Sequence, residues 1–201
     1  MPKATGPASS RTKLDREELV ATVLRLTREV GLDGLTMRRL AQELGVTPMA
    51  AYHWVPSKQA LIDLTLESVL EQLALVEHTG TWVEQLRSRA ISYRDTVALY
   101  PGVGAALINH PVSKLTRDSI AEGLEILRGA GFEEPELGYA WGAYQSFMLG
   151  HHSLEAQRNR RGAPRKRDEI SRLRYDGAGP EAFDWGLDVV LAALEAKAPR
   201  R

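Results

Sequence analysis

Cysteine is absent from this sequence of 201 residues. Disulfide frameworks, cysteine-ligated metal centres and cysteine nucleophiles are therefore excluded. Net charge is also absent, because 26 Lys and Arg balance 26 Asp and Glu. This balance excludes a histone-like polycation but not a local basic patch. The first residues lack the apolar core of a signal peptide, and the long uncharged runs carry glycine and polar residues, unlike a membrane span. We therefore expect a soluble cytoplasmic protein without membrane contact.

The charges are distributed unevenly along the chain. Residues 1–60 hold nine Lys and Arg against six Asp and Glu, whereas residues 61–201 hold seventeen against twenty. A basic N-terminal segment followed by a mildly acidic remainder is typical of a protein whose N-terminal part binds phosphates. A three-charge excess is also common by chance, so the charge distribution alone does not indicate DNA binding.

Helical spacing of apolar residues runs through almost the whole chain and predicts an all-α fold. The Pro-, Gly- and Ser-rich residues 1–13 read as a flexible arm. Asp15 and Glu18 then form a capping-box pattern at the first helix, which Gly31 ends. The same spacing, with caps and breakers, predicts helices over 15–30, 37–44, 48–54, 57–77, 82–100, 103–109, 113–129, 135–157 and 180–197. Residues 158–179 read as an exposed loop with a short helical turn near 170–173.

The segment from Thr36 to Val55 has the pattern of a helix-turn-helix motif. Thr36 can cap the first helix, Gly45 permits the turn, and Thr47 can cap the second helix with Pro48 at its first position. Leu40, Ala41 and Leu44 face inward. The outer side of the second helix then carries Thr47, Pro48, Met49, Tyr52 and His53. A helix presented this way fits the DNA major groove, although an αα-hairpin used only for packing has the same turn.

Residues 15–76 resemble the DNA-binding domain of the TetR family of transcriptional repressors. The stretches EVGLDGLTMRRLAQELGV (29–46) and AAYHWVPSKQAL (50–61) carry this resemblance. LRGAGF at 127–132 and the spaced motifs at 147–157 and 183–195 also resemble the tetracycline-repressor subgroup. The resemblance implies an arm (1–13), a three-helix helix-turn-helix DNA-binding domain (14–74) and a helical ligand-binding and dimerisation domain (75–201). It further implies a homodimeric repressor released from a palindromic double-stranded DNA operator by a small-molecule inducer.

Roles for single residues follow from the same resemblance. Thr36, Tyr52 and Lys58 would contact phosphates, while Arg38, Pro48, Met49 and His53 would face bases, with Thr47 beside them. Three departures from the tetracycline repressor matter: Met37 replaces a hydroxyl residue, Pro48-Met49 replaces a Gln-Pro pair, and His53-Trp54 inverts a Trp-His order. The operator is therefore expected to differ from that of the tetracycline repressor.

One face of the helix predicted over 135–157 has the composition of a ligand pocket. At 100° per residue, aromatic and apolar side chains with a few polar heads share one arc. This inner arc consists of Trp141, Tyr144, Gln145, Met148, His152 and Glu155, and Leu107 and His110 from the short preceding helix complete the expected pocket. Because the arc has no Lys or Arg, we expect a largely apolar, aromatic or polycyclic ligand. The competing interpretation is ordinary hydrophobic core.

The opposite arc of this helix predicts a subunit interface. It carries the small residues Gly142, Ala143, Ser146, Gly150 and Ser153, which allow another helix to approach closely. The last helix has an apolar stripe of Phe183, Leu187, Val190 and Leu194, with Gly186 beside it. Two such helices from each subunit would form a four-helix dimer core.

His151, His152 and Glu155 form the one cluster that suggests other chemistry. Spacings of three and four residues place either histidine beside the carboxylate, as a divalent metal site requires. Glu155 resembles a carboxylate of the tetracycline-repressor magnesium site, but the matching histidine near 108–109 is missing, although His110 is close. A helical metal-dependent enzyme or ligand-binding protein centred on this cluster is the alternative function. We expect no cofactor, no metal and no enzymatic activity.

The basic residues allow two further interpretations. The arginine- and lysine-rich segment 158–167 reads as a solvated loop rather than a second nucleic-acid site. A helical interaction protein that uses the helix-turn-helix only for packing is disfavoured, because Arg38, Tyr52 and Lys58 fall on the exposed side.

Overall fold

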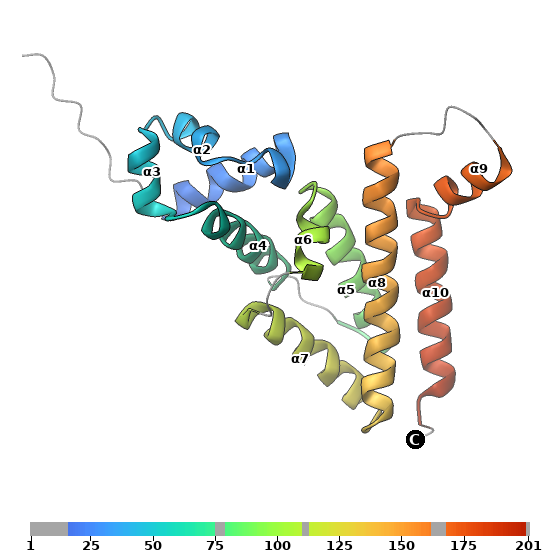
Figure 1. Ribbon diagram of the computed structural model, residues 1–201. Coiled ribbons are helices and arrows are strands. Elements are labelled where there is room, and N and C mark those ends of the chain that lie inside the picture. Colours follow the sequence, from blue (N-terminus) through green and yellow to red (C-terminus); the bar gives the residue numbers. More distant parts are fainter. Residues whose placement is uncertain (1–15, 75–78, 110–112, 162–167, 200–201) are drawn as a thin grey trace, which may run out of the picture.

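The computed structural model describes residues 16–74, 79–109, 113–161 and 168–199, and these residues form helices without any strand. The all-α fold class is therefore confirmed. The helices are α1 (Arg16–Gly34), α2 (Met37–Glu43), α3 (Pro48–Trp54), α4 (Lys58–Ala74), α5 (Trp82–Ala98), α6 (Val103–Asn109), α7 (Lys114–Gly129), α8 (Glu136–Arg161), α9 (Glu169–Asp176) and α10 (Pro180–Lys197) (Figure 1). Among these residues, no helix is both long and apolar enough to cross a bilayer.

The predicted helix caps are present in the N-terminal half. The hydroxyl of Thr36 accepts a hydrogen bond from the Arg39 amide, and that of Thr47 accepts one from the Ala50 amide, both at 3.2 Å. Gly45 makes the turn between α2 and α3 with a φ of +64°, a region that side chains disfavour. The predicted capping residue Asp15 lies outside the described residues.

Gly31 interrupts α1 but does not end it. Its φ of +69° and ψ of 169° are not helical, and one further turn follows up to Gly34. The predicted helix end at Gly31 was therefore wrong in part, because glycine changes the direction of the chain and the last turn then forms against another part of the molecule. The Leu32 amide donates a hydrogen bond to the carbonyl oxygen of Pro101 at 2.8 Å.

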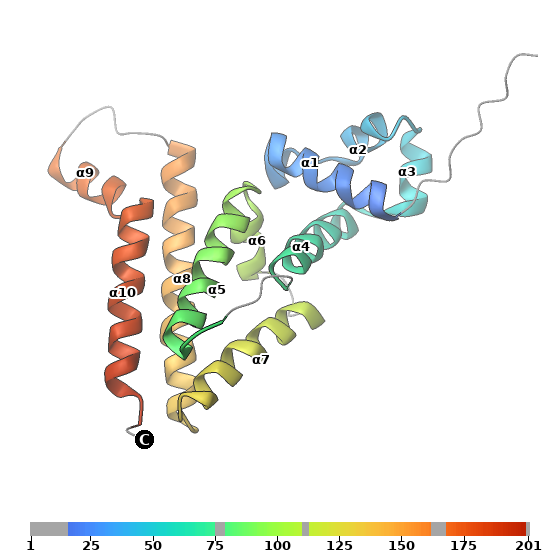
Figure 2. The same cartoon turned by 180° about the vertical axis from the view of Figure 1, so that it is seen from behind.

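Two hydrophobic clusters organise the fold. The first is formed by residues of α1, α2, α3 and α4. It also includes Tyr100 and Val103, from the segment around the α5–α6 turn. The second joins α5, α7, α8 and α10. In both views α8 and α10 run side by side, with α9 at one end of the pair (Figures 1 and 2). The division at residue 74 remains a prediction, and the first cluster reaches across it.

The structure corrects the expected loop at 158–179. Residues 158–161 continue α8, and the short turn predicted near 170–173 is the longer helix α9, which Asp168 caps through the Ser171 amide. Arg158 lies with its guanidinium 4.3 Å from the centre of the Tyr175 ring. This contact joins the end of α8 to α9, which the periodicity of either segment alone does not reveal. Residues 162–167 lie outside the described residues.

Candidate functional site

The outer face of α3 presents side chains to solvent. Met49 is 75% exposed and Tyr52 is 44% exposed, and Thr47, Pro48 and His53 are exposed as well. Ala51, on the opposite side of α3, is completely buried in the first cluster. The small inward residue holds α3 close to α2, and the helix-turn-helix therefore projects one side of α3 away from the core (Figure 1).

Arg38 is exposed in the first turn of α2, the helix that precedes α3. It lines a shallow groove of about 270 Å³ with Leu26, Glu29, Arg39, Gln42 and Glu43. The carboxylates of Glu29 and Glu43 both pair with Arg25, at 3.1 and 2.6 Å. Because these two acids are paired with Arg25, the exposed Arg38 and Arg39 give this edge a positive character. Arg39 was not among the predicted site residues, although its position next to Arg38 was the signal for it.

Lys58 binds the protein's own backbone in this structure. Its Nζ donates hydrogen bonds to the carbonyl oxygen of Leu35 and, at 3.5 Å, to that of Leu32. Burial lowers the pKa of the ammonium group, since a charge loses hydration there. Lys58 thus joins the start of α4 to the end of α1, and its predicted phosphate contact stays a prediction.

Thr36 and Thr47 use their hydroxyl oxygens as cap acceptors, and each hydroxyl keeps its own hydrogen for donation. The cap geometry therefore agrees with a phosphate contact at either residue. Trp54, the last residue of α3, is also 41% exposed, although it was not among the predicted site residues.

The inner arc of α8 is buried at its centre and half-buried at its other positions. Tyr144 and Met148 are almost fully buried. The Tyr144 hydroxyl donates to the Leu86 carbonyl oxygen of α5 at 2.8 Å, and burial raises the pKa of this phenol. The ring of Trp141 lies 5.7 Å from that of Tyr144, against the bare backbone of Gly123 in α7.

The polar members of the arc are close to α5 and α6. The His152 ring lies 6.1 Å from the Tyr93 ring, and its Nε2 lies against Gly104 of α6. Gln145 and Glu155 are half-buried. Leu107 packs against the first hydrophobic cluster, on the side toward the N-terminal helices. His110 lies outside the described residues, so its predicted place in the pocket stays a prediction.

His151 lies deeper than its neighbour His152. It is 7% exposed, with its ring 5.2 Å from that of Phe183 and 5.9 Å from that of Phe147. Burial lowers the pKa of both histidines, while Glu155 opposes that shift. Four buried atoms on this stretch of α8 have no hydrogen-bond partner among the described residues: His151 Nε2, His152 Nδ1, Glu155 Oε2 and Arg158 Nε.

The histidine–glutamate cluster does not form a metal site of three ligands. Within the described parts of the chain, no group of three or more His, Cys, Asp or Glu is placed to hold a metal ion. The two histidines leave α8 in different directions, since His151 faces Phe183 and His152 faces Tyr93. Their separation explains why adjacency in sequence does not produce convergent ligands here.

The predicted interface stripe on α10 is mostly internal. Phe183, Leu187 and Leu194 are buried in the second cluster of their own chain, and Val190 packs at its margin. The stripe was therefore assigned wrongly as an intersubunit surface, because its apolar residues already face α5 and α8. The exposed large apolar residues of this helix are Trp185, at 70%, and Val189.

Small and apolar residues also lie on the outer arc of α8. Ala143, Ser146 and Gly150 are exposed, as the predicted interface requires, while Gly142 and Ser153 are half-buried. Tyr139, 70% exposed, and Leu154 continue the same side. An apolar surface therefore follows α8 and α10 outside the chain's own core.

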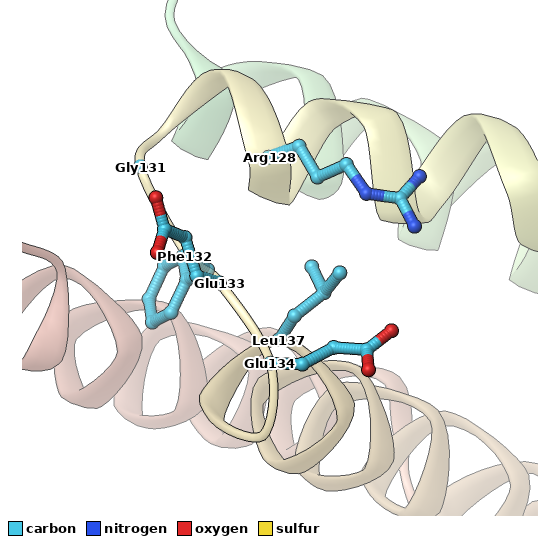
Figure 3. A pocket seen from close by; sticks show the side chains of 6 residues that line it. All are labelled: Arg128, Gly131, Phe132, Glu133, Glu134 and Leu137. Carbon is cyan, nitrogen blue, oxygen red and sulfur yellow. The ribbon is translucent and has the colours of Figure 1, made fainter.

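A cavity of about 370 Å³ lies at the turn between α7 and α8, away from the predicted pocket. Its lining includes Arg128, Phe132, Glu134 and Leu137 (Figure 3). Arg128 pairs with Glu125 at 2.6 Å on the same helix. This cavity was not predicted from the sequence.

Comparisons with known proteins agree with this architecture. The family model described as bacterial regulatory proteins, tetR family, matches residues 19–64, and the model for the tetracyclin repressor-like C-terminal domain matches residues 76–180. The class C tetracycline repressor of Escherichia coli is 30% identical over 91% of each chain. The HTH-type transcriptional repressor DrrR1 of Streptomyces coeruleorubidus is 30% identical over 98% of this chain and 82% of its own. The solved structure of a single-substitution variant of TetR from Acinetobacter baumannii AYE in complex with minocycline has a TM-score of 0.73 at 26% identity, covering 94% of this chain and all of that one.

Proposed function

This chain belongs to the TetR family of bacterial regulatory proteins, and we propose that it is a cytoplasmic, homodimeric repressor that a small, largely apolar ligand releases from its operator. The observation that carries the proposal is the outer face of α3. A helix in the major groove reads bases with residues near its N-terminus, and there this chain exposes Pro48, Met49, Tyr52 and His53. Its task is binding rather than catalysis.

The assignment of contacts follows from chemistry at this face. Arg38 is the one exposed arginine among the predicted base-facing residues, and a guanidinium suits bidentate pairing with guanine. Thr36, Thr47 and Tyr52 carry hydroxyls that can donate to phosphate oxygens. Met49 offers an apolar surface for a thymine methyl group.

The exposed sides of α8 and α10 support assembly through these helices. A palindromic operator needs two reader helices, by which we mean α3 of each subunit. A two-fold dimer supplies both. Tyr139, Leu154, Trp185 and Val189 provide the apolar surface, and the small residues between them permit close helix packing. The dimer core thus uses the face of α10 opposite to Phe183.

The proposed ligand site is the inner arc of α8. Trp141, Tyr144 and Met148 supply aromatic and apolar contacts, and His152 with Glu155 supplies polar heads. Since these side chains already pack against α5, α6 and α7, a ligand has to displace some of them. A ligand that binds the displaced state better shifts the equilibrium, and a coupling of about 1–3 kcal/mol suffices for useful induction.

Fluorescence anisotropy on the DNA upstream of the gene that encodes the chain tests the DNA-binding function. The wild type should bind this DNA well above random DNA, and Met49→Ala combined with Tyr52→Ala should remove the preference. Ile170→Ala on the exposed side of α9 is the matched control and should bind like the wild type. Equal binding of the wild type to upstream and random DNA would overturn the repressor assignment.

Minocycline, which the Acinetobacter relative binds, is the first probe for the pocket. Binding is followed by tryptophan fluorescence in the wild type and in Trp141→Phe, and DNA release is followed in parallel. If minocycline releases DNA equally from the wild type and from a Trp141→Phe, Tyr144→Phe, Met148→Ala variant, the pocket lies elsewhere and the arc is only core.

A further inference from the structure

The first turn of α10 begins without a side-chain cap. Its N-cap is Gly179, which is buried and makes no side-chain hydrogen bond, and Pro180 at the next position has no N–H. The Phe183 amide donates the first hydrogen bond of the helix to the Gly179 carbonyl oxygen at 3.1 Å. The amides of Glu181 and Ala182 therefore precede the hydrogen-bonded part of α10 and receive no side-chain acceptor from the N-cap.

Two polar side chains of α8 lie against this glycine. A Cβ on Gly179 would lie 3.8 Å from both Cζ and Nη2 of Arg158. The backbone of Gly179 is also close enough to His151 to favour its protonated ring. Because Arg158 stacks on Tyr175 of α9 as well, the end of α8, α9 and the start of α10 meet at this point (Figures 1 and 2).

The groups that meet here are hydrogen-bond donors without an acceptor. Nε of Arg158 and Nε2 of His151 are buried and have no partner among the described residues, and His151 is only 7% exposed. An arginine Nε and a backbone amide can only donate, and a histidine ring donates from both nitrogens when it is protonated. Buried polar groups are rarely left unpaired. A partner for this set has to accept several hydrogen bonds, which an oxyanion does better than a water molecule.

The carboxylates nearby do not supply this acceptor. Asp184 pairs with Arg94 of α5 at 3.0 Å. Glu155 precedes Arg158 by three residues, but its Oε2 is itself buried without a partner among the described residues. The sequence between α8 and α9, residues 162–167, has three basic residues and no acid. An acceptor from outside the chain is therefore needed.

The charges that face His151 come from three helices. Glu155 of α8 and Asp184 of α10 favour its protonated form, whereas Arg94 of α5 opposes it. The neighbouring His152 also interacts unfavourably with a protonated His151. Burial has the largest influence and lowers the pKa of His151. A bound anion would offset this cost, because it stabilises the charged ring.

We propose that a small oxyanion, either a phosphate group or a carboxylate, binds at the N-terminus of α10 between Arg158 and His151. The amides of Glu181 and Ala182 complete its set of donors. The site lies on the side of α8 that faces α9 and α10, whereas the inner arc faces α5, α6 and α7. Its ligand is therefore a second effector, distinct from the inducer. The bound oxyanion caps α10 and, through Arg158, holds α9 against α8.

Titration with three anions tests the site. Phosphate, acetate and chloride are added separately to the full-length protein at constant ionic strength, and the backbone amides are followed by NMR. We expect saturable shifts of the Glu181 and Ala182 amides with phosphate or acetate, and none with chloride. Tighter binding of phosphate assigns a phosphate group, and tighter binding of acetate assigns a carboxylate. Absence of a saturable shift with both oxyanions would overturn the proposal.

Charge-matched variants locate the binding. Arg158→Gln should weaken the oxyanion about tenfold to a hundredfold, because a charged hydrogen-bond donor is lost. Arg160→Gln removes the same charge from an exposed position two residues further on and should bind like the wild type. Equal losses in both variants would indicate general charge attraction and refute the site. If Arg158→Gln does not fold, Arg158→Lys replaces it. Lysine keeps the charge without the Nε donor, and unchanged affinity would also refute the site.

The ring of His151 provides a readout that a purely structural role would not change. Its pKa, measured by NMR of the ring, should rise when the oxyanion is bound, since the anion favours the protonated form. His152 faces Tyr93 of α5 instead, and its pKa should change less. An unchanged pKa of His151 at saturating oxyanion would contradict the proposed position. These measurements need neither DNA nor inducer, so they stand apart from the test of the proposed function.

Discussion

α3 and α8 carry the two faces on which the proposed function of this chain depends. The side chains of one face are exposed, and the central side chains of the other are buried. α3 leaves Met49 and Tyr52 exposed and free to meet a partner. α8 buries Tyr144 and Met148 against α5 and α7, with the Tyr144 hydroxyl already bonded to Leu86. The side chains of α3 can therefore meet DNA as they stand, whereas those of the inner arc already pack against neighbouring helices. We accordingly predict that a ligand bound at this arc repacks Tyr144 and Met148.

The largest expected effect distinguishes the two faces of α10. Leu187→Ala removes a fully buried side chain and should lower the free energy of unfolding by about 2–5 kcal/mol, measured by urea denaturation. Trp185→Ala on the opposite face should leave the chain folded and weaken self-association instead, measured by sedimentation equilibrium. A wild type that remains monomeric at micromolar concentration would contradict the assigned interface.

The second-largest expected effect concerns DNA binding by Arg38 of α2 and Tyr52 of α3. Arg38→Ala should cost about 1–3 kcal/mol on upstream DNA and relax the preference at one base pair. Tyr52→Ala should weaken binding to all DNA about equally, because it removes the proposed phosphate contact. Both are measured by anisotropy on the upstream sequence and on random DNA at several salt concentrations. Equal losses on both DNAs for Arg38→Ala would remove its role in base reading.

The cap of α3 gives a smaller effect, which is measured on stability without DNA. Thr47→Ala leaves the Ala50 amide without its side-chain acceptor and should destabilise the protein by about 0.5–2 kcal/mol. Thr47→Ser keeps the hydroxyl and serves as the matched control. Equal stability of Thr47→Ala and wild type in thermal unfolding would show that the cap contributes nothing.

The smallest effect is a pH dependence from the buried side of α8. Burial lowers the pKa values of His151 and His152 below the usual 6.5. The unfolded chain therefore binds protons first, and the free energy of unfolding should fall as pH drops below about 6.5. His151→Gln with His152→Gln should flatten this slope between pH 7.5 and 5.5 in urea titrations. An unchanged slope would assign the dependence to other groups.

Local contacts in this chain could be predicted from the sequence, whereas contacts between distant residues could not. Thr36, Gly45 and Thr47 determine local geometry through contacts within a few residues, so the helix-turn-helix was predictable from spacing and capping. The contact between Arg28 and Tyr100 joins residues 72 positions apart, and no local pattern contains it.

Apolar stripes were the least reliable signal. Burial inside the chain and burial between chains favour the same residues, and the stripe of Phe183 and Leu187 was therefore assigned to the wrong surface. The inner arc has the same ambiguity between pocket and core. Glu155 and His152, with buried atoms that lack partners, are the polar positions at which a pocket would differ from core.

Selection of DNA from a random library by the full-length wild type tests the central claim most directly, because it needs neither a known operator nor an inducer. The account predicts an enriched inverted repeat whose two half-sites lie about 34–36 Å apart along the helix, or a multiple of that distance. It also predicts that Met49→Ala with Tyr52→Ala loses the enrichment. A pool without a common motif, bound no better than the starting library, would contradict the account.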